Sequence, residues 1–258
     1  MNTLVFDIET VPDVAFGRRL HRLEGLPDAQ VAKAMFALRR QGTGGDFLPL
    51  EQQRVVAISC ALRQGESFFK VWSVGEAGSS EGELLQRFFD GIAKFSPDLV
   101  SWNGSGFDLP VLSYRALLWG VQAGRFWETG EADVDFRYNN YLGRYHWRHT
   151  DLMDVLSGFI PRNRVSLANM ASLLGLPGKL GFGGDQVWDA WQRGDAVGIR
   201  RYCETDVLNT YLIWLRFEQL RGRLTAEAHG AEVQRLRAYL GASTEPHLGQ
   251  FLAAWTAS

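Results

Sequence analysis

The sequence of 258 residues holds only two cysteines, Cys60 and Cys203. Because they show neither a disulfide framework nor a metal-site spacing, we expect both thiols to be reduced. The chain also has no large excess of either charge, since its net charge is −2 and its isoelectric point is near 6.2. This excludes the strongly basic surface that drives nonspecific binding to duplex nucleic acid. No apolar run is long enough to span a bilayer, and no basic and apolar leader precedes the first predicted strand. We therefore expect a cytoplasmic protein without a membrane partner.

What the chain does have is enough apolar sequence for a sizeable core, since 46% of its residues are hydrophobic and 22% are charged. We expect one domain over 1–223, interrupted by an excursion over about 11–53, and a helical extension over 224–258 that packs on it. The patterns predict strands at 54–63, 67–74 and 98–102, a hairpin turn around Gln64–Glu66, and helices at 28–40, 82–94, 109–119, 166–174 and 224–239.

The first group of informative acids lies in the apolar run Leu4–Thr10, which is typical of a buried strand. Side chains alternate across a strand, so Asp7 and Glu9 share one face while Phe6 and Ile8 take the other. Two carboxylates roughly 7 Å apart in a sheet interior repel each other and resist desolvation, and a divalent ion would compensate both. The alternative is that the strand ends at Phe6 and both acids face water.

A second acid follows the predicted strand at 98–102, where a loop of small residues leads into a helix. Asp108 stands at the start of that helix, and helix capping is the plain interpretation of an aspartate there. The loop favours a second interpretation, because its two glycines let the backbone approach a ligand closely. Asn103 and Phe107 would then be free to contact a substrate.

The third group lies in a strongly helical stretch that carries one largely apolar stripe. Asp206 falls on this stripe, with Tyr202 one turn before it, so we expect both side chains to point inward. Glu204 and Arg201 lie off the stripe, which predicts a solvated surface position for both.

These three segments resemble the three exonuclease motifs of the DEDDy group of 3′-5′ exonucleases, which includes the exonuclease domains of family-B DNA polymerases. The resemblance rests on Asp7–Thr10, on Asn103–Pro110 and on Tyr202 with Asp206. Together with Gln186–Trp188, the third motif is similar to a bacterial family of stand-alone exonucleases without a polymerase domain. The resemblance covers most of residues 1–220 and implies an α/β fold of the ribonuclease-H-like type, with a mixed sheet flanked by helices and 1–223 as the exonuclease domain.

Phosphodiester hydrolysis accounts for these residue types, because it needs an activated water and neutralisation of charge on the phosphate and on the departing oxygen. Two divalent ions about 4 Å apart supply all of these, and Mg²⁺ and Mn²⁺ prefer oxygen ligands. We expect Asp7 to bridge both ions, with Glu9 and Asp206 on the ion that holds the water. Asp108 would serve the second ion, and Tyr202 would orient or help to deprotonate the water.

The expected substrate is a single-stranded end, most simply of DNA, whose terminal nucleotide contacts Thr10, Asn103 and Phe107. The same site would serve a 3′-5′ exoribonuclease or oligoribonuclease, because discrimination between the sugars depends on contacts to the 2′-hydroxyl. A nucleic-acid-binding module without catalysis is a further alternative. Such modules can lose metal ligands, whereas this chain retains all four acids. A sugar hydrolase needs only two acids, so that alternative leaves Asp108 and Asp206 unexplained.

Three other stretches bear on the site. The segment 137–149 mixes arginines and histidines with tyrosines and a tryptophan, which suits phosphate contact and base stacking or, equally, a surface loop with aromatic anchors. Asp151 is expected to cap a helix, with a place near the site as the alternative. The glycine-rich stretch 180–185 departs from the family's pattern and affects the expected loop contacts, whereas it leaves the four acids and the tyrosine of the motifs in place.

Overall fold

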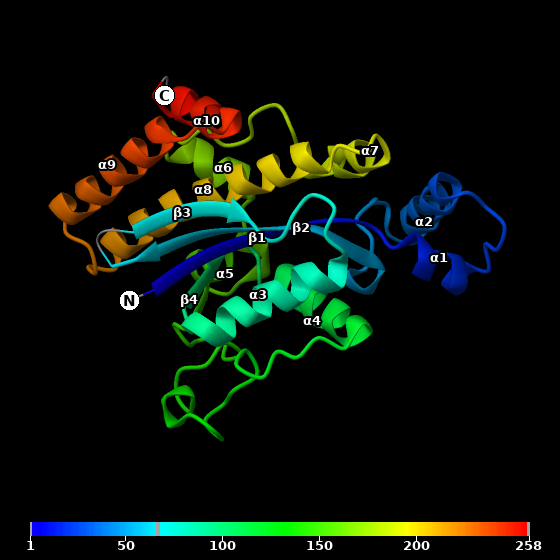
Figure 1. The fold of residues 1–258 in the computed structure, drawn as a ribbon, viewed down its shortest axis with the longest axis horizontal. Helices are drawn as coiled ribbons and strands as arrows, with labels where there is room; N and C mark the ends of the chain where they lie inside the picture. The colour runs from blue at the N-terminus through cyan, green and yellow to red at the C-terminus, as the bar shows by residue number, and fades with distance from the viewer. Residues whose placement is uncertain (1, 66–67, 257–258) are drawn as a thin grey trace.

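A five-stranded mixed sheet forms the centre of the computed structural model, which describes residues 2–65 and 68–256 (Figure 1). The strands are β1 (Asn2–Pro12), β2 (Gln53–Gln64), β3 (Phe68–Ser73), β4 (Asp98–Ser101) and β5 (His149–Asp151). Their order is β3-β2-β1-β4-β5; β2 runs antiparallel to both of its neighbours, β3 and β1, whereas β1, β4 and β5 run parallel. This is the α/β, ribonuclease-H-like arrangement that the sequence predicted, and it places β1 at the centre.

The helices flank this sheet and extend beyond one end of it. They are α1 (Val14–His21), α2 (Asp28–Thr43), α3 (Glu81–Phe95), α4 (Asp108–Trp119), α5 (Leu152–Leu156), α6 (Leu167–Leu173), α7 (Val187–Gln192), α8 (Ala196–Leu220), α9 (Ala226–Ala242) and α10 (Pro246–Thr256). The helices predicted from the sequence are all present, with ends shifted by a few residues. None of the helices in the described part of the chain is long and apolar enough to cross a membrane.

Alternation along β1 decides which side chains face which layer. Phe6 and Ile8 pack in one core with α3 and α4, whereas Val5 packs in the other core with α8, α9 and α10. Figure 1 shows these two sets of helices on opposite faces of the sheet. Asp7 and Glu9 share the parity of Val5, so both lie on the face that α8 crosses, and the predicted alternation is confirmed.

The excursion between β1 and β2 holds one helix more than the sequence indicated. The predicted helix at 28–40 is α2, but α1 was not predicted, because Gly17 in its middle is a weak helix former. A Cβ atom at Gly17 would meet the side chain of Met35 at 2.2 Å, so the glycine allows α1 and α2 to pack closely. Val31, Met35 and Leu48 form a small core of their own between these helices.

The C-terminal segment holds a second helix beyond the one predicted at 224–239. The helix predicted at 224–239 is α9, and α10 follows it and buries Phe251 and Trp255 in the core beside α8. The surface position predicted for Glu204 is wrong, because its carboxylate accepts hydrogen bonds from Ser73 Oγ at 2.6 Å and pairs with His247 Nε2 at 2.7 Å. The helix α10, which the sequence pattern did not reveal, is what covers this side chain.

The strands predicted at 54–63 and 98–102 are confirmed as β2 and β4. The strand predicted at 67–74 is β3, which the structure describes from Phe68. The predicted hairpin turn around Gln64–Glu66 includes residue 66, and the predicted strand begins at residue 67; both of these residues lie outside the described residues.

Candidate functional site

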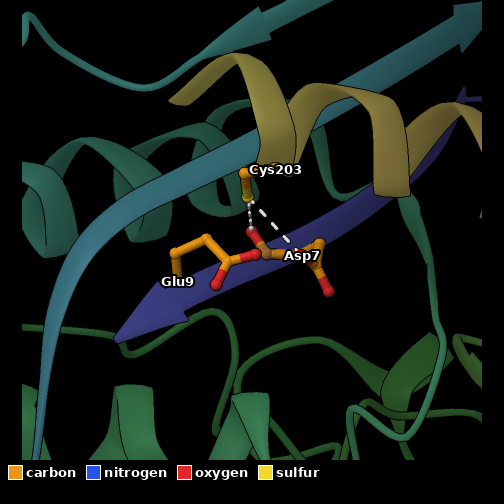
Figure 2. Close-up of side chains that lie close together, drawn as sticks. All are labelled: Asp7, Glu9 and Cys203. Carbon is orange, nitrogen blue, oxygen red and sulfur yellow. Dashed lines mark hydrogen bonds between the residues drawn. The ribbon is translucent and has the colours of Figure 1, made fainter. Parts of the chain in front are cut away.

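Asp7 and Glu9 project from the same face of β1 toward α8, as Figure 2 shows together with Cys203. One ligand atom from each of these three residues lies within 4.8 Å of the others. The pairing of β1 with β2 shifts register between Glu9 and Thr10, since Glu9 pairs with Ala57 while Thr10 pairs with Val55. This bulge adds a residue to β2, and such a bulge increases the local twist of the strand pair, here directly beside Glu9.

Cys203 acts in this group as a hydrogen-bond donor. Its Sγ donates to the backbone oxygen of Asp7 at 3.4 Å and to Oδ2 of the same residue at 3.5 Å. Burial, followed by the charges of Asp7 and Glu9, raises the pKa of the thiol well above its usual value, so the sulfur keeps its proton. A protonated thiol is a poor metal ligand, and the hard donors of the cluster are therefore the two carboxylates.

Asp108 reaches β1 from the neighbouring parallel strand. The pairing of β4 with β1 ends at Val100 and Val5, which leaves the Ile8 N–H without a partner from β4. Oδ1 of Asp108 accepts that N–H at 3.1 Å, and the residue is 2% exposed. The N-cap of α4 is Phe107 and Asp108 is the first helical residue, so plain N-capping does not explain its position.

Burial is the largest cause of the raised pKa of Asp108, which lies at about 7. The backbone N–H groups of Ile8 and of Asp108 itself lower this pKa, while the charge of Asp151 raises it. A carboxylic acid that titrates near neutral pH holds its charge only weakly, and a nearby cation would stabilise that charge strongly.

Asp206 and Tyr202 complete the group from α8, whose first turn is capped by Asp195. Burial raises the pKa of Asp206 to about 6, although a hydrogen bond from Tyr202 and the charge of Lys179 lower it. Burial also raises the pKa of Tyr202 far above its ordinary value, and the charges of Asp206 and Glu9 add to this effect. The tyrosine hydroxyl is therefore a proton donor at neutral pH, which favours the orienting role over deprotonation.

The four carboxylates interact with one another strongly. Burial raises the pKa of Asp7 well above its usual value, and the charges of the other three raise it further: Asp108, Glu9 and Asp206. Burial likewise raises the pKa of Glu9, with contributions from Asp206 and Asp108. The structure thus brings together all four acids that the sequence singled out, at the point where β1 passes the end of β4.

Lys179 is the basic residue of this group, and the sequence did not identify it. Its charge lowers the pKa of both Glu9 and Asp206. The preceding residue, Gly178, exchanges two hydrogen bonds with the side chain of Asn209 on α8, at 3.1 and 3.0 Å, and has a φ of 61°. This clamp, three residues after Asp206, fixes the lysine beside the acids, and only a long-range contact could have revealed it.

A cleft of about 760 Å³ opens beside Glu9; we call it the Glu9 cleft. Its lining comes from the end of β1, from 36–53, from Phe107 and from 179–189. The volume falls within the range of roughly 300–1,000 Å³ that is typical of ligand pockets. The sequence-predicted substrate residues Thr10 and Phe107 both line it, and the Thr10 hydroxyl donates to Gln53 Oε1 at 2.8 Å.

Asn103, the third predicted substrate residue, builds the loop after β4 and does not line the Glu9 cleft. It has a φ of 66°, and its carbonyl accepts the N–H groups of Gly106 and Phe107 at 2.9 Å each. Asp151 accepts the N–H groups of Asn103 at 2.9 Å and Ser105 at 3.0 Å, and it also caps α5. The predicted capping by Asp151 is confirmed, and the same carboxylate holds the loop near the site.

The segment 137–149 is largely a surface loop, and two of its arginines are held by contacts within the protein. Arg144 forms an ion pair with Asp154 at 2.8 Å, and the Arg148 guanidinium lies 3.8 Å from the centre of the Phe136 ring. The glycine-rich stretch 180–185 also makes a packing contact, because Phe182 in it lies 4.9 Å from Tyr202, centre to centre.

Comparison with known proteins gives a consistent result. The model of a family described as "Predicted 3'-5' exonuclease related to the exonuclease domain of PolB" matches residues 45–255. The chain is 28% identical over 139 residues to a DNA polymerase of Archaeoglobus fulgidus, covering 52% of this chain and 17% of the polymerase. It is 27% identical over 157 residues to a DNA polymerase of Pyrococcus glycovorans, covering 58% of this chain and 20% of the polymerase. The chain thus spans a fifth or less of the length of these polymerases.

Among solved structures, the chain is similar to the family B DNA polymerase of Pyrobaculum calidifontis. The identity is 20% and the TM-score is 0.47, and the match covers 85% of this chain and 24% of the polymerase.

Proposed function

The chain belongs to the family of predicted 3′-5′ exonucleases related to the exonuclease domain of PolB, and on this premise we propose that it is a metal-dependent 3′-5′ exonuclease. It removes nucleoside monophosphates from single-stranded DNA ends. The observation that carries the proposal is the group of four carboxylates with raised pKa values beside the Glu9 cleft.

The donor set fits Mg²⁺ or Mn²⁺. All four carboxylates offer oxygen ligands, which these ions prefer, and burial disfavours their charges unless a cation is added. Two ions, held by Asp7, Glu9, Asp108 and Asp206, would activate a water and neutralise charge on the phosphate and the departing oxygen.

The other residues of the site position the water and the substrate. Tyr202, which donates a hydrogen bond to Asp206, holds a neutral hydroxyl that orients the attacking water. Lys179 on the wall of the Glu9 cleft adds positive charge near the scissile phosphate. Thr10 and Phe107 bound the space for the terminal nucleotide, and Asn103 shapes the loop that carries Phe107.

The domain assignment follows from the same proposal. Residues 1–223 form the exonuclease domain, with the insertion at about 11–53, and 224–258 form its C-terminal extension. A cleft that encloses one terminus favours single strands, because a paired end must fray before it enters.

The test uses 5′-labelled single-stranded DNA and RNA of the same sequence, incubated with Mg²⁺ or Mn²⁺ and resolved by length. We expect a descending ladder from linear DNA, no cutting of a circular strand and no effect of a 5′ block. Asp108→Asn should abolish the ladder, while the matched control Asp90→Asn, an exposed acid on α3, should leave it intact.

Two results would overturn the proposal. Efficient cutting of the circular strand would indicate an endonuclease, and binding without any cleavage in either metal would indicate a nucleic-acid-binding module. A ladder from RNA in preference to DNA would replace the proposed substrate with RNA.

A further inference from the structure

The helical part of the α1–α2 insertion precedes the span that the family model matches, which begins at residue 45. It projects from the sheet where β1 ends (Figure 1), and it is held together by its own small core of Val31, Met35 and Leu48. The family model therefore does not cover these two helices, whose role must be inferred from this chain, whereas the residues from 45 onward fall within the match. The segment that returns from α2 to β2 lines the Glu9 cleft.

Hydrogen bonds to the backbone oxygens of Phe47 and Leu48 hold the returning segment in place. The Phe47 carbonyl accepts a hydrogen bond from Arg39 Nε at 2.7 Å. The next residue, Leu48, is 2% exposed, and its carbonyl accepts from Gln53 Nε2 at 3.0 Å. Gln53 in turn accepts from the Thr10 hydroxyl, so this hydrogen-bonded series ties the segment to the end of β1.

The side chain of Phe47 is nevertheless 62% exposed. Its ring lies 5.4 Å from that of Phe107, centre to centre, at an interplanar angle of 57°. Both rings line the Glu9 cleft. A large apolar ring that is held in place and left open to a cleft is a feature of ligand sites rather than of a core.

Charged and aromatic side chains both line the Glu9 cleft. Glu9 and Lys179 are among the charged ones, and Phe36, Phe47 and Phe107 are among the aromatic ones. A nucleotide likewise combines a charged phosphate with an apolar base face. Aromatic side chains stack on every base, because each base offers a π-face, and such binding tolerates any sequence.

We propose that Phe47 is the base-stacking residue for the 3′-terminal nucleotide, and that the α1–α2 insertion holds it opposite Phe107. The inference rests on the proposed function for the position of the terminus, and it assigns to this insertion the recognition of the base. Phe47 contributes binding and orientation, while the chemistry stays with the carboxylates. The site discriminates a terminus that carries a base from one that does not.

The experiment compares two oligodeoxynucleotides that differ only in the 3′-terminal residue, which is either thymidine or an abasic site. Their affinities are measured by fluorescence anisotropy with Mg²⁺ present, on Asp206→Asn protein so that the DNA stays intact. Phe47→Ala in this background should weaken binding of the thymidine end about 5- to 150-fold and leave binding of the abasic end unchanged. Phe47→Trp should keep the preference.

Phe95→Ala is the matched control, because Phe95 on α3 is also exposed (44%) and does not line the cleft. It should leave both affinities unchanged. Equal affinities of Phe47→Ala and its parent for the thymidine end, or equal losses on both oligonucleotides, would overturn the inference. The inference would also be overturned if the effect of Phe47→Ala on affinity disappeared with an abasic site at the penultimate position rather than at the terminus.

The same substitution in the otherwise unchanged protein separates this inference from the proposed function. Loss of base discrimination in kcat/KM, with cleavage retained, supports the stacking role. If the unmodified protein degrades no oligonucleotide, the proposed exonuclease activity fails, and the anisotropy measurement still decides whether Phe47 binds a base.

Discussion

Two groups of buried acids on and near β1 differ in whether an arginine compensates their charge. At the end of β1, Asp13 and Glu81 share Arg115, which donates to Glu81 from Nε at 2.7 Å and from a second nitrogen at 2.6 Å. A third nitrogen of the same guanidinium lies 2.5 Å from Asp13. Burial alone would raise the pKa of Asp13, but the Phe16 N–H and Arg115 bring it below its usual value.

The four motif carboxylates, of which Asp7 and Glu9 lie a few residues earlier on β1, share no arginine of this kind among the described residues, and Lys179 lowers the pKa of only two of them. Among the described residues no arginine appears with the charges that lower the pKa values of Asp7, Glu9, Asp108 or Asp206. Burial therefore raises the pKa values of all four, and repulsion between the motif carboxylates adds to the rise at Asp7 and Glu9. A paired buried acid stabilises a fold, whereas unpaired buried acids indicate a site that takes its cation from solution.

The largest expected effect is on catalysis. Asp7→Asn keeps the bulk of the side chain and removes a ligand charge, so cleavage of single-stranded DNA should fall by several orders of magnitude. Unfolding in urea should be little changed, or shifted toward greater stability, because one of four repelling charges is gone. EDTA should abolish activity of the unsubstituted protein. Near-normal turnover of Asp7→Asn with added metal would show that the carboxylates are not ligands.

Tyr202→Phe removes only the hydroxyl that donates to Asp206. We expect the rate to fall about 10²- to 10⁴-fold, the range associated with a positioned acid-base group, with metal affinity nearly unchanged. Single-turnover kinetics and calorimetric metal titration measure the two quantities separately. An unchanged rate would reduce Tyr202 to a core residue that packs against Phe182.

The opposite result is expected for the paired acids. Arg115→Met leaves Asp13 and Glu81 buried without their cation, and such a loss costs about 3–5 kcal/mol of unfolding free energy. Urea denaturation measures it. Protein that remains folded should still cleave DNA, because Arg115 does not line the Glu9 cleft. A stable Arg115→Met protein would contradict the structural role of this group.

A pH series sharpens the comparison with a smaller effect. In EDTA, the folded protein holds protons on Asp108 and Asp206 up to pH values near 7 and 6, whereas unfolded aspartates lose them near pH 3.9. The folded state therefore binds more protons, and these groups lower the stability as pH rises through 6 and 7. Mn²⁺ competes with those protons, so it should raise the Tm by more at pH 8 than at pH 5.5. In Asp108→Asn, the rise in Tm caused by Mn²⁺ should differ less between pH 8 and pH 5.5. An equal rise in Tm at both pH values in the unsubstituted protein would contradict the pKa directions.

Local patterns were sufficient to predict the elements that carry the acids. Alternation along Leu4–Thr10 placed Asp7 and Glu9 on one face, and the stripe on the helix placed Asp206 inward. These predictions succeed because strand and helix periodicities act over a few residues. The prediction for Glu204 was wrong because its burial depends on a distant segment: α10, about forty residues further along the chain, covers it.

The parts that sequence reasoning missed depend on contacts between distant segments. Lys179 reaches the acids through the clamp between Gly178 and Asn209. Phe47 reaches Phe107 through the packing of the insertion. Neither residue belongs to a periodic pattern, so the sequence offered no signal for its place in the site.

The most direct test of the central claim is to count the Mn²⁺ ions bound per chain by electron paramagnetic resonance, with thymidine 5′-monophosphate present. The account predicts saturable binding of two ions to the unsubstituted protein and a marked loss in Asp7→Asn, while Asp90→Asn binds normally. No saturable binding at millimolar Mn²⁺, or equal binding by Asp7→Asn, would contradict the claim that the unpaired carboxylates form a metal site.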